Sequence, residues 1–444
     1  MWKRWTNCFE VFASRGGATR AIPRSEPFVP LERHFARAKP SLLPGNRFFT
    51  DTDATFPSLD RCARHVKCYY VGVMSRSKWL RRLLVGMCAL PVAGTLLSLS
   101  RRRTHWFFRV WDFPRVQIAA VAAVGGTSYA LRFFRGSAAD FAVLLPTTAV
   151  LAWQCYRIRT YTPLVSPTVL RVRPEEADAE NRITLMMTNV LMENDQHARL
   201  VAAVEQANPD VVLAVEIDDR WHAALEPLFV RYPYAVRCPQ NNYYGMVLLS
   251  RFPLVEPRVE YLVQDDIPSI HTGVRLKSGV QVTLHGLHPR PPEPLRDQPS
   301  SPRDAELVVV GRMIGDDKDT PTIVAGDLND VAWSPTSELF VRLSGLLDPR
   351  AGRGFYNSYN AKSRLFRYPL DHVFHSKHFK LVRIERCPSV GSDHFPILIE
   401  LQYVPTAASE QEGSKKRPGD EEIADEKLEQ EAEDAATGAD RPRE

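Results

Sequence analysis

Eight acidic, amide and imidazole side chains stand at the ends of short apolar segments in the second half of the sequence. Polar groups at the end of a buried strand need partners, because leaving them unpaired costs free energy. One such residue would be an ordinary turn residue, but a set of this size predicts that the side chains converge on one another and on a bound ion. The eight residues are Asn189, Glu216, His288, Asp327, Asn329, Asp371, Asp393 and His394.

The donor atoms of this set favour one class of ion. Glu216, Asn189 and Asp393 offer hard oxygen ligands, which suit Mg²⁺, with Mn²⁺ as the alternative. The sequence has no HExxH motif, no zinc-type cysteine pair and no Walker-type glycine loop. These absences argue against a zinc protease and against a nucleoside-triphosphate site.

The segments that must position these residues read as alternating strands and helices. Strands are predicted at ITLMMTNV, VVLAVEID, YGMVLLS, TGVRLK, VQVTLHGLH, TPTIVAGD, PLDHVFHS, FKLVRIERC and FPILIEL. Helices are predicted at residues 195–210, 301–316 and 337–346, the second of which begins with Ser-Pro. This mixture predicts an α/β layered domain over residues 182–404.

Six motifs in this domain resemble the endonuclease/exonuclease/phosphatase superfamily, the DNase I-like fold, in a membrane-anchored bacterial-type form. They are TNV (188–190), VEID (215–218), LHGLHP (284–289), GDLND (326–330), PLDHVF (369–374) and GSDHFP (391–396), in the order that the family has. The resemblance covers about half of the chain and implies a four-layered α/β sandwich, with two mixed sheets flanked by helices. It departs from the family pattern at Val215, where the family usually has Gln.

The resemblance implies metal-dependent hydrolysis of a phosphate ester. Glu216 matches the main metal carboxylate, with Asn189 beside it and Asp393 as a further metal-site acid. These matches imply a bound Mg²⁺ or Mn²⁺.

The remaining motif residues match groups that handle water and phosphate. Asp327 resembles the residue that orients or deprotonates the attacking water, and Asn329 the residue that holds water and phosphate. His394 and His288 are expected to contact phosphate oxygens, and Asp371 is expected to fix the tautomer of His394. His285 is expected to be structural.

The substrate is open between two classes of phosphate ester. The first is a lipid-linked phosphate or pyrophosphate at the membrane, for which Arg350 and Arg353 are candidate substrate contacts, whereas Tyr244 would stack on a base in the second class. The second is nucleic acid, although the domain has no long basic run with interleaved aromatic residues. A third interpretation, a scaffold that kept the fold and lost activity, is opposed by the complete set of polar residues.

Three uncharged apolar segments precede the domain, at residues 83–100, 116–131 and 141–156. They predict a membrane region over 82–157 with three transmembrane helices, and the alternative is a buried helical hairpin of a soluble domain. Arginine counts in the flanking loops give opposite orientations. The side on which the domain lies therefore stays open, with the extracytoplasmic side favoured.

Three further segments flank these regions. Met74 opens a basic stretch that leads into an apolar run, so residues 1–73 are predicted to be an upstream extension or disordered. Residues 158–181 are rich in Pro and charge and read as a linker. Residues 405–444 are predicted to be a disordered acidic tail. Residues 409–444 hold 13 Asp/Glu and 6 Lys/Arg, a net charge of −7, whereas the whole chain has a net charge of +5. The sequence does not indicate an oligomeric state.

Overall fold

The computed structural model describes residues 59–100, 105–292 and 298–439, with side chains described from residue 76 onward. The chain divides into two compact units, Met1–Lys67 and Cys68–Glu444. All the contacts below lie within the second unit. The predicted extension at 1–73 lies almost wholly outside the residues whose side chains are described.

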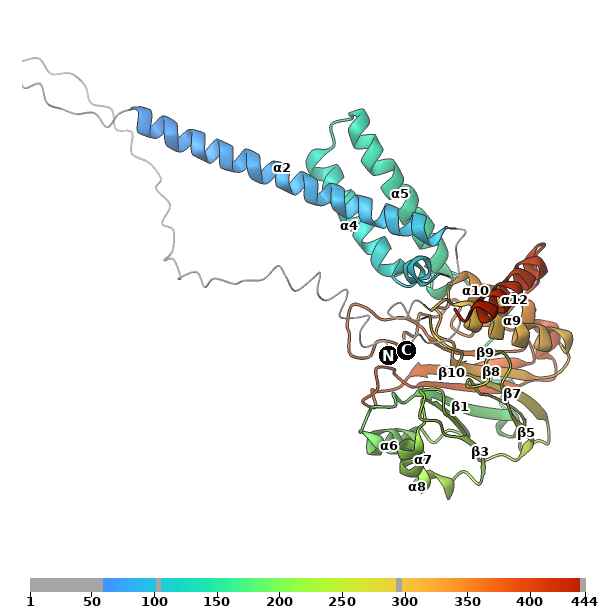
Figure 1. Cartoon of the computed structure of the whole chain (residues 1–444). Coiled ribbons are helices and arrows are strands. Elements are labelled where there is room, and N and C mark those ends of the chain that lie inside the picture. Colours follow the sequence, from blue (N-terminus) through green and yellow to red (C-terminus); the bar gives the residue numbers. More distant parts are fainter. Residues whose placement is uncertain (1–58, 101–104, 293–297, 440–444) are drawn as a thin grey trace, which may run out of the picture. The chain divides into compact units, whose positions relative to one another are not determined.

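Helices make up the N-terminal part of the second unit (Figure 1). They are α2 (Leu59–Ser98), α3 (Trp106–Arg109), α4 (Arg115–Phe133) and α5 (Ala138–Ile158), with short 3₁₀ turns η1 (Val110–Asp112) and η2 (Arg159–Tyr161). In the described residues two segments are long and apolar enough to cross a membrane, Arg76–Ser98 and Ala138–Tyr161. The predicted third span is not confirmed. Its helix, α4, has 19 residues and carries arginine at both ends and a Gly-Gly-Thr-Ser interruption.

Two mixed β-sheets form the centre of the following domain. The first sheet has the order β10-β11-β1-β2-β4-β3, and the second has the order β5-β6-β7-β8-β9. Strands β1 and β2 are parallel, as are β7 and β8, and the other neighbours are antiparallel. The strands are β1 (Arg182–Asn189), β2 (Val211–Val215), β3 (Tyr234–Cys238), β4 (Met246–Ser250), β5 (Leu254–Glu260), β6 (Ser269–Arg275), β7 (Gln281–Leu287), β8 (Thr322–Asp327), β9 (Asp371–His375), β10 (Phe379–Arg386) and β11 (Ile397–Tyr403).

Side-chain alternation along the strands divides the core into layers. In β1, Leu185 and Met187 face the core between the two sheets, whereas Met186 faces α6 (His197–Ala207), α7 (Asp219–Ala224) and α8 (Glu226–Phe229). In β8, Ile323 faces the inner core and Val324 faces α9 (Ser301–Asp316) and α10 (Pro335–Ser344). The structure thus confirms two mixed sheets flanked by helices, and the layers are helix, sheet, sheet and helix.

The segment predicted to be a linker packs on the domain. It contains η3 (Pro174–Glu176) and η4 (Ala179–Asn181), and Arg171 forms a bridge with Leu381 of β10. Val169 is only 1% exposed and belongs to the core between the sheets. Val169 therefore anchors the segment to the domain. The overall polar composition of the segment does not indicate this contact.

The acidic C-terminal segment also differs from the expectation of disorder. It forms α11 (Ala407–Glu410) and α12 (Asp420–Thr437), and α12 lies along α9 (Figure 1). Ala424 of α12 is fully buried in a small apolar cluster, and Lys427 Nζ lies 2.6 Å from Asp304 Oδ2. The acids of α12 find basic partners on the domain, such as Arg312, which contacts Glu421 and Asp425.

Candidate active site

The polar residues named from the sequence meet at one edge of the two sheets. Asn189 ends β1 and Glu216 follows β2, so the parallel pairing of these strands brings their ends together. In the second sheet Asp327 ends β8, and its cross-strand partner in β9 is Asp371. His288 follows β7, which is parallel to β8.

Gly326 allows β8 to approach β7 just before the acid. A Cβ atom at this position would lie 1.9 Å from the carbonyl oxygen of Leu287, a distance that no side chain can occupy. The glycine of the GDLND motif is therefore required by backbone proximity. It sets the position of Asp327 relative to the end of β7.

One amide side chain joins the two sheets at the site. Asn189 Nδ2 donates to Glu216 Oε1 at 2.8 Å and to Asp327 Oδ2 at 3.0 Å. Its Oδ1 accepts the backbone N–H of Leu191 at 2.9 Å. In this arrangement Asn189 orients two carboxylates, and its oxygen faces the backbone instead of a metal position.

A histidine lies between two carboxylates that would otherwise repel each other across β8 and β9. His394 Nδ1 lies 2.7 Å from Asp371 Oδ2, and His394 Nε2 lies 3.6 Å from Asp327 Oδ2. Burial alone would lower the pKa of His394, but the carboxylates of Asp371 and Asp327 raise it to about 10. The ring is thus held in its protonated form, with a positive charge in the site.

This charge decides which residues fit a metal ion. Asp327, Asp371 and His394 bring ligand atoms within 4.8 Å of one another. A protonated imidazole has no free lone pair, however, so it can contact a phosphate but cannot bind a metal. The second group, Glu216 and Asp393, fits a divalent cation better. Burial, and then the Asp393 charge, raise the pKa of Glu216 to about 7, although the hydrogen bond from Asn189 and the charge of His394 lower it.

The backbone at two site residues is held in a left-handed conformation. Glu216 has φ 63° and Asn329 has φ 51°. Such residues cost about 1–3 kcal/mol each and persist where the surroundings enforce them, often at functional sites. Asn329 is fixed by its N–H to Asp327 Oδ1 at 3.0 Å and by its side-chain amide to the carbonyl of Pro289 at 3.0 Å.

His288 forms another wall of the site together with an aromatic ring. It is 2% exposed, and its Nδ1 has no hydrogen-bond partner among the described residues. Burial lowers its pKa to about 4, so the ring is neutral. The ring of Tyr244 lies 5.5 Å from that of His288, and the Arg290 guanidinium lies 5.2 Å from the Tyr244 ring. Tyr244, named as a substrate contact, is therefore adjacent to the site.

The two arginines named as substrate contacts, Arg350 and Arg353, form hydrogen bonds with other groups of the protein. Arg350 is 3% exposed and holds Asp348 through Nε at 2.9 Å and Nη2 at 2.8 Å. Arg353 donates to the backbone carbonyls of Pro349 at 3.1 Å and Val169 at 2.5 Å. Both guanidinium groups make contacts within the protein, and a role of either arginine in binding a substrate anion stays a prediction.

Three residues at the site did not emerge from the sequence. The Tyr359 ring lies 5.0 Å from the His394 ring, and Tyr359 is 2% exposed. Ser392 Oγ donates to the carbonyl of Asn189 at 2.8 Å and accepts the N–H of His394 at 2.9 Å. Ser358 Oγ accepts the N–H of Asp371 at 3.1 Å. Ser392 lies within the GSDHFP motif and could have been found, whereas the segment around Tyr359 has no strand or helix pattern.

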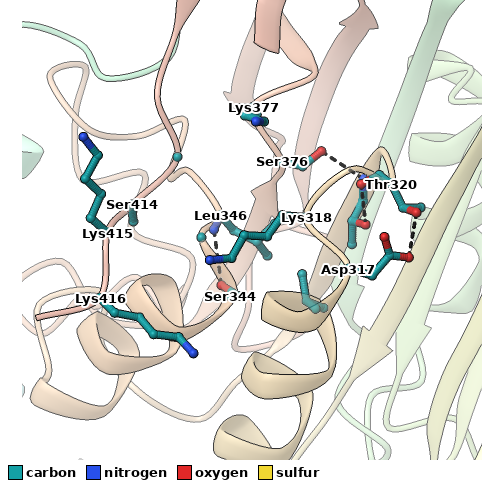
Figure 2. A pocket seen from close by; sticks show the side chains of 14 residues that line it. Asp317, Lys318, Thr320, Ser344, Leu346, Ser376, Lys377, Ser414, Lys415 and Lys416 are labelled. Carbon is teal, nitrogen blue, oxygen red and sulfur yellow. Dashed lines mark hydrogen bonds between the residues drawn. The ribbon is translucent and has the colours of Figure 1, made fainter. Parts of the chain in front are cut away.

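A separate cavity of about 360 Å³ lies at the opposite end of β8 (Figure 2). It is lined by Thr322, where β8 begins, and by Lys318 and Lys377. The catalytic candidates lie where β8 ends, at Asp327. This cavity is therefore distinct from the candidate active site.

The part of the chain that contains the site matches a known protein family. Residues 188–394 match the profile of the Endonuclease/Exonuclease/phosphatase family. No curated protein was found to match the chain.

Several solved structures resemble the domain. Humanized TDP2 of D. rerio shares 17% identity and a TM-score of 0.42, covering 50% of this chain and 99% of that chain. The catalytic domain of human Nocturnin shares 18% identity and a TM-score of 0.41, covering 51% and 97%. An endonuclease/exonuclease/phosphatase family protein of Bacteroides thetaiotaomicron shares 17% identity and a TM-score of 0.41, covering 50% and 98%.

Proposed function

We propose that this chain, whose residues 188–394 match the profile of the Endonuclease/Exonuclease/phosphatase family, hydrolyses a phosphate ester with the help of a divalent cation. The observation that carries this proposal is the meeting of Glu216 and Asp393 with Asp327 and a protonated His394 at one edge of the sheets. It combines a cation site, a candidate base and a positive phosphate contact.

The side chains divide the work of an in-line attack of water on phosphorus. Glu216 and Asp393 would hold a divalent cation such as Mg²⁺, which when bound stabilises charge on phosphate oxygens. Asp327 orients the attacking water and accepts its proton. His394, fixed by Asp371, donates a hydrogen bond to a phosphate oxygen on which negative charge develops. Asn329 and His288 line the phosphate position.

The proposed substrate class is a phosphate or pyrophosphate carried by a membrane lipid. Its support is the pair of apolar helices, Arg76–Ser98 and Ala138–Tyr161, which would anchor the domain at a bilayer. Retention of the full chain in membranes after alkaline carbonate washing tests the anchor. Release of the chain by that wash would contradict it.

The activity test uses the full chain in detergent micelles with Mg²⁺. The substrates are polyprenyl phosphate and phosphatidic acid in mixed micelles, with plasmid DNA beside them. We expect phosphate release from the lipid and intact plasmid. Nicked plasmid with untouched lipids would make the protein a tethered nuclease, and no hydrolysis of any substrate would contradict a phosphoesterase.

The Asp327→Asn variant links the activity to the site. Loss of a general base reduces turnover by about 10²–10⁴-fold. Asp317→Asn is the matched control, because Asp317 lines the cavity at the opposite end of β8. Equal loss in both variants, or no loss in Asp327→Asn, would contradict the role of Asp327.

A further inference from the structure

The turn that follows β8 carries the candidate catalytic residues and is held by backbone contacts from the domain. This catalytic turn, residues 328–333, begins directly after Asp327. Arg303 Nη1 donates to the carbonyl of Asn329 at 2.8 Å, and His372 Nε2 lies 2.9 Å from the carbonyl of Asp330. These contacts come from α9 and β9.

The same turn is also held by the N-terminal helical region. Trp333 Nε1 donates to the carbonyl of Asp112 at 2.8 Å. Tyr161 donates its hydroxyl hydrogen to the carbonyl of Ala332 at 2.8 Å, and Arg157 Nη2 donates to the carbonyl of Trp333 at 2.7 Å. The residues from η1 to η2 thus contact two consecutive backbone carbonyls and the Trp333 side chain of the catalytic turn.

Arg109, the last residue of α3, makes the contact nearest to the catalytic residues. It is 3% exposed, and its Nη2 lies 3.4 Å from Asp330 Oδ2 and 3.2 Å from Thr336 Oγ1. Its Nη1 lies 3.3 Å from Asp112 Oδ2. Burial alone would lower the pKa of Arg109, but the carboxylates of Asp304, Asp330 and Asp112 raise it above its ordinary value. The guanidinium therefore stays charged among acids.

Asp330 links Arg109 to the backbone of the catalytic turn. Its Oδ1 accepts the N–H of Val331 at 3.0 Å, and its Oδ2 accepts hydrogen bonds from Ser334 and Ser337. Without Arg109, Asp330 keeps only the more distant Arg303 as a cationic partner among the described residues, with Arg303 Nη1 3.7 Å from Asp330 Oδ1. Weakening the charge compensation of a buried acid favours its rearrangement. A rearrangement of Asp330 would act on Asn329, whose left-handed φ of 51° depends on its surroundings.

We propose that Arg109 is a positioning residue for the active site, holding Asp330 and through it the turn that follows Asp327 and carries Asn329. This inference rests on the proposed function. It makes the N-terminal helices part of the catalytic unit as well as a candidate anchor. A purely structural role would attach the helices to the domain without changing the chemistry.

The test compares Arg109→Met, Arg109→Lys and Arg342→Met in the full chain in detergent. Arg342 is the matched control, because it makes a bidentate pair with Asp420 at 2.8 Å, and none of its hydrogen bonds among the described residues reaches the catalytic turn. Turnover and KM are measured with phosphatidic acid in the mixed micelles of the activity test and normalised to the folded fraction. Hydrogen exchange is followed at the amides of Leu328, Asn329 and Val331, each of which is hydrogen-bonded.

We expect kcat of Arg109→Met to fall about 10–100-fold with KM little changed, because small misplacements of reacting groups cost up to about 10²-fold. Arg109→Lys keeps the charge and should recover part of the loss. Exchange at residues 328–331 should accelerate in Arg109→Met and not in Arg342→Met. Should Arg109→Met fail to fold, Arg109→Lys against Arg342→Met gives the same comparison.

Unchanged exchange at 328–331, or a kcat loss no greater than that of Arg342→Met, would overturn the inference. The exchange measurement needs no substrate, so it separates this inference from the proposed function. Faster exchange in a protein whose wild type hydrolyses nothing would contradict the function and leave the contact between Arg109 and the turn in place.

Discussion

At the scale of single residues, the charges of the site are unevenly compensated. His394 lies between Asp327 and Asp371, whereas no ion pair with a cationic side chain is found for Glu216 or Asp393 among the described residues. A bound cation would lower the pKa of Glu216, which burial and the Asp393 charge raise. We therefore predict that a cation binds on the Glu216 side of the site.

The first prediction concerns Glu216→Gln, which removes one carboxylate and keeps the side-chain volume. Loss of a group that merely supports a metal ligand costs about 10–100-fold in metal affinity, so loss of the ligand should cost at least about 10-fold. The measurement is the Mg²⁺ concentration for half-maximal turnover, together with Mn²⁺ binding followed by electron paramagnetic resonance. Glu226→Gln, on an exposed position of α8, is the control, and an unchanged Mn²⁺ affinity in Glu216→Gln would place the ion elsewhere.

A second acid gives a prediction about pH. Glu306 of α9 is 4% exposed, and its Oε1 has no hydrogen-bond partner among the described residues. Burial raises its pKa from 4.5 to about 8, so the folded protein binds the proton more tightly than the unfolded chain does. Stability should therefore fall as pH rises from about 4.5 to about 8.

Glu306→Gln removes this titration. The gain in Tm of the variant over the wild type should be smallest near pH 4.5 and should grow up to about pH 8. Thermal unfolding in a pH series measures it, with the exposed Glu426→Gln of α12 as control. A Tm difference that does not vary with pH would show that Glu306 finds a partner when charged.

Residues that follow apolar strands were predictable, whereas residues defined by tertiary partners were not. Asp327 and Glu216 follow runs of apolar residues, so their residue types and their positions in the sequence are enough to identify them as candidate site residues. In the sequence Arg350 has no evident partner, and only the fold shows that it forms an ion pair with Asp348. Tyr359 reaches His394 from an irregular segment whose path no periodic pattern encodes.

At the scale of elements, the strands buried on both faces were predicted and two edge strands were missed. Strands β3 and β5 lie at the ends of their sheets, are partly exposed and lack a continuous apolar run. Strand β5 also contains Pro257 at a register shift in its pairing with β6, as expected for an edge strand. Apolar patterning reports burial, so it finds the centre of a sheet more readily than its edges.

Helix α12 provides the prediction at this scale. Its composition indicates a solvated tail, yet Ala424 contacts the α9–α10 surface and Lys427 pairs with the buried Asp304. A chain ending at Pro418 leaves Asp304 without this lysine and exposes Val308, Leu339 and Leu343. We expect its Tm to fall, by roughly 2–4 °C for each kcal/mol lost.

The control for this truncation is a chain ending at Gly438, which keeps all of α12. Differential scanning calorimetry of both chains and of the full chain gives the comparison. Equal Tm values in all three would show that the acidic segment contributes no packing, as its composition alone suggests.

At the scale of the whole molecule, the N-terminal helices and the candidate catalytic domain are not separated where composition separates them. The sequence separates a membrane region, a linker and a catalytic domain. The structure instead connects residues 109–161 to the catalytic turn through Arg109, Tyr161 and Arg157. A change from apolar to polar composition marks the end of an apolar helix and says nothing about what the polar residues contact.

The last prediction follows from these contacts. A fragment of residues 162–444 keeps both sheets and every candidate catalytic residue, but it leaves the backbone carbonyls of Ala332 and Trp333 without Tyr161 and Arg157. A domain joined to an anchor by a passive linker would keep its full kcat and Tm in this fragment. We expect instead that both fall relative to residues 68–444 in detergent, because buried groups that lose their partners must rearrange or take up water. Turnover of phosphatidic acid in mixed micelles and thermal unfolding measure the two effects, and equal values in both chains would show that the N-terminal helices do not support the site.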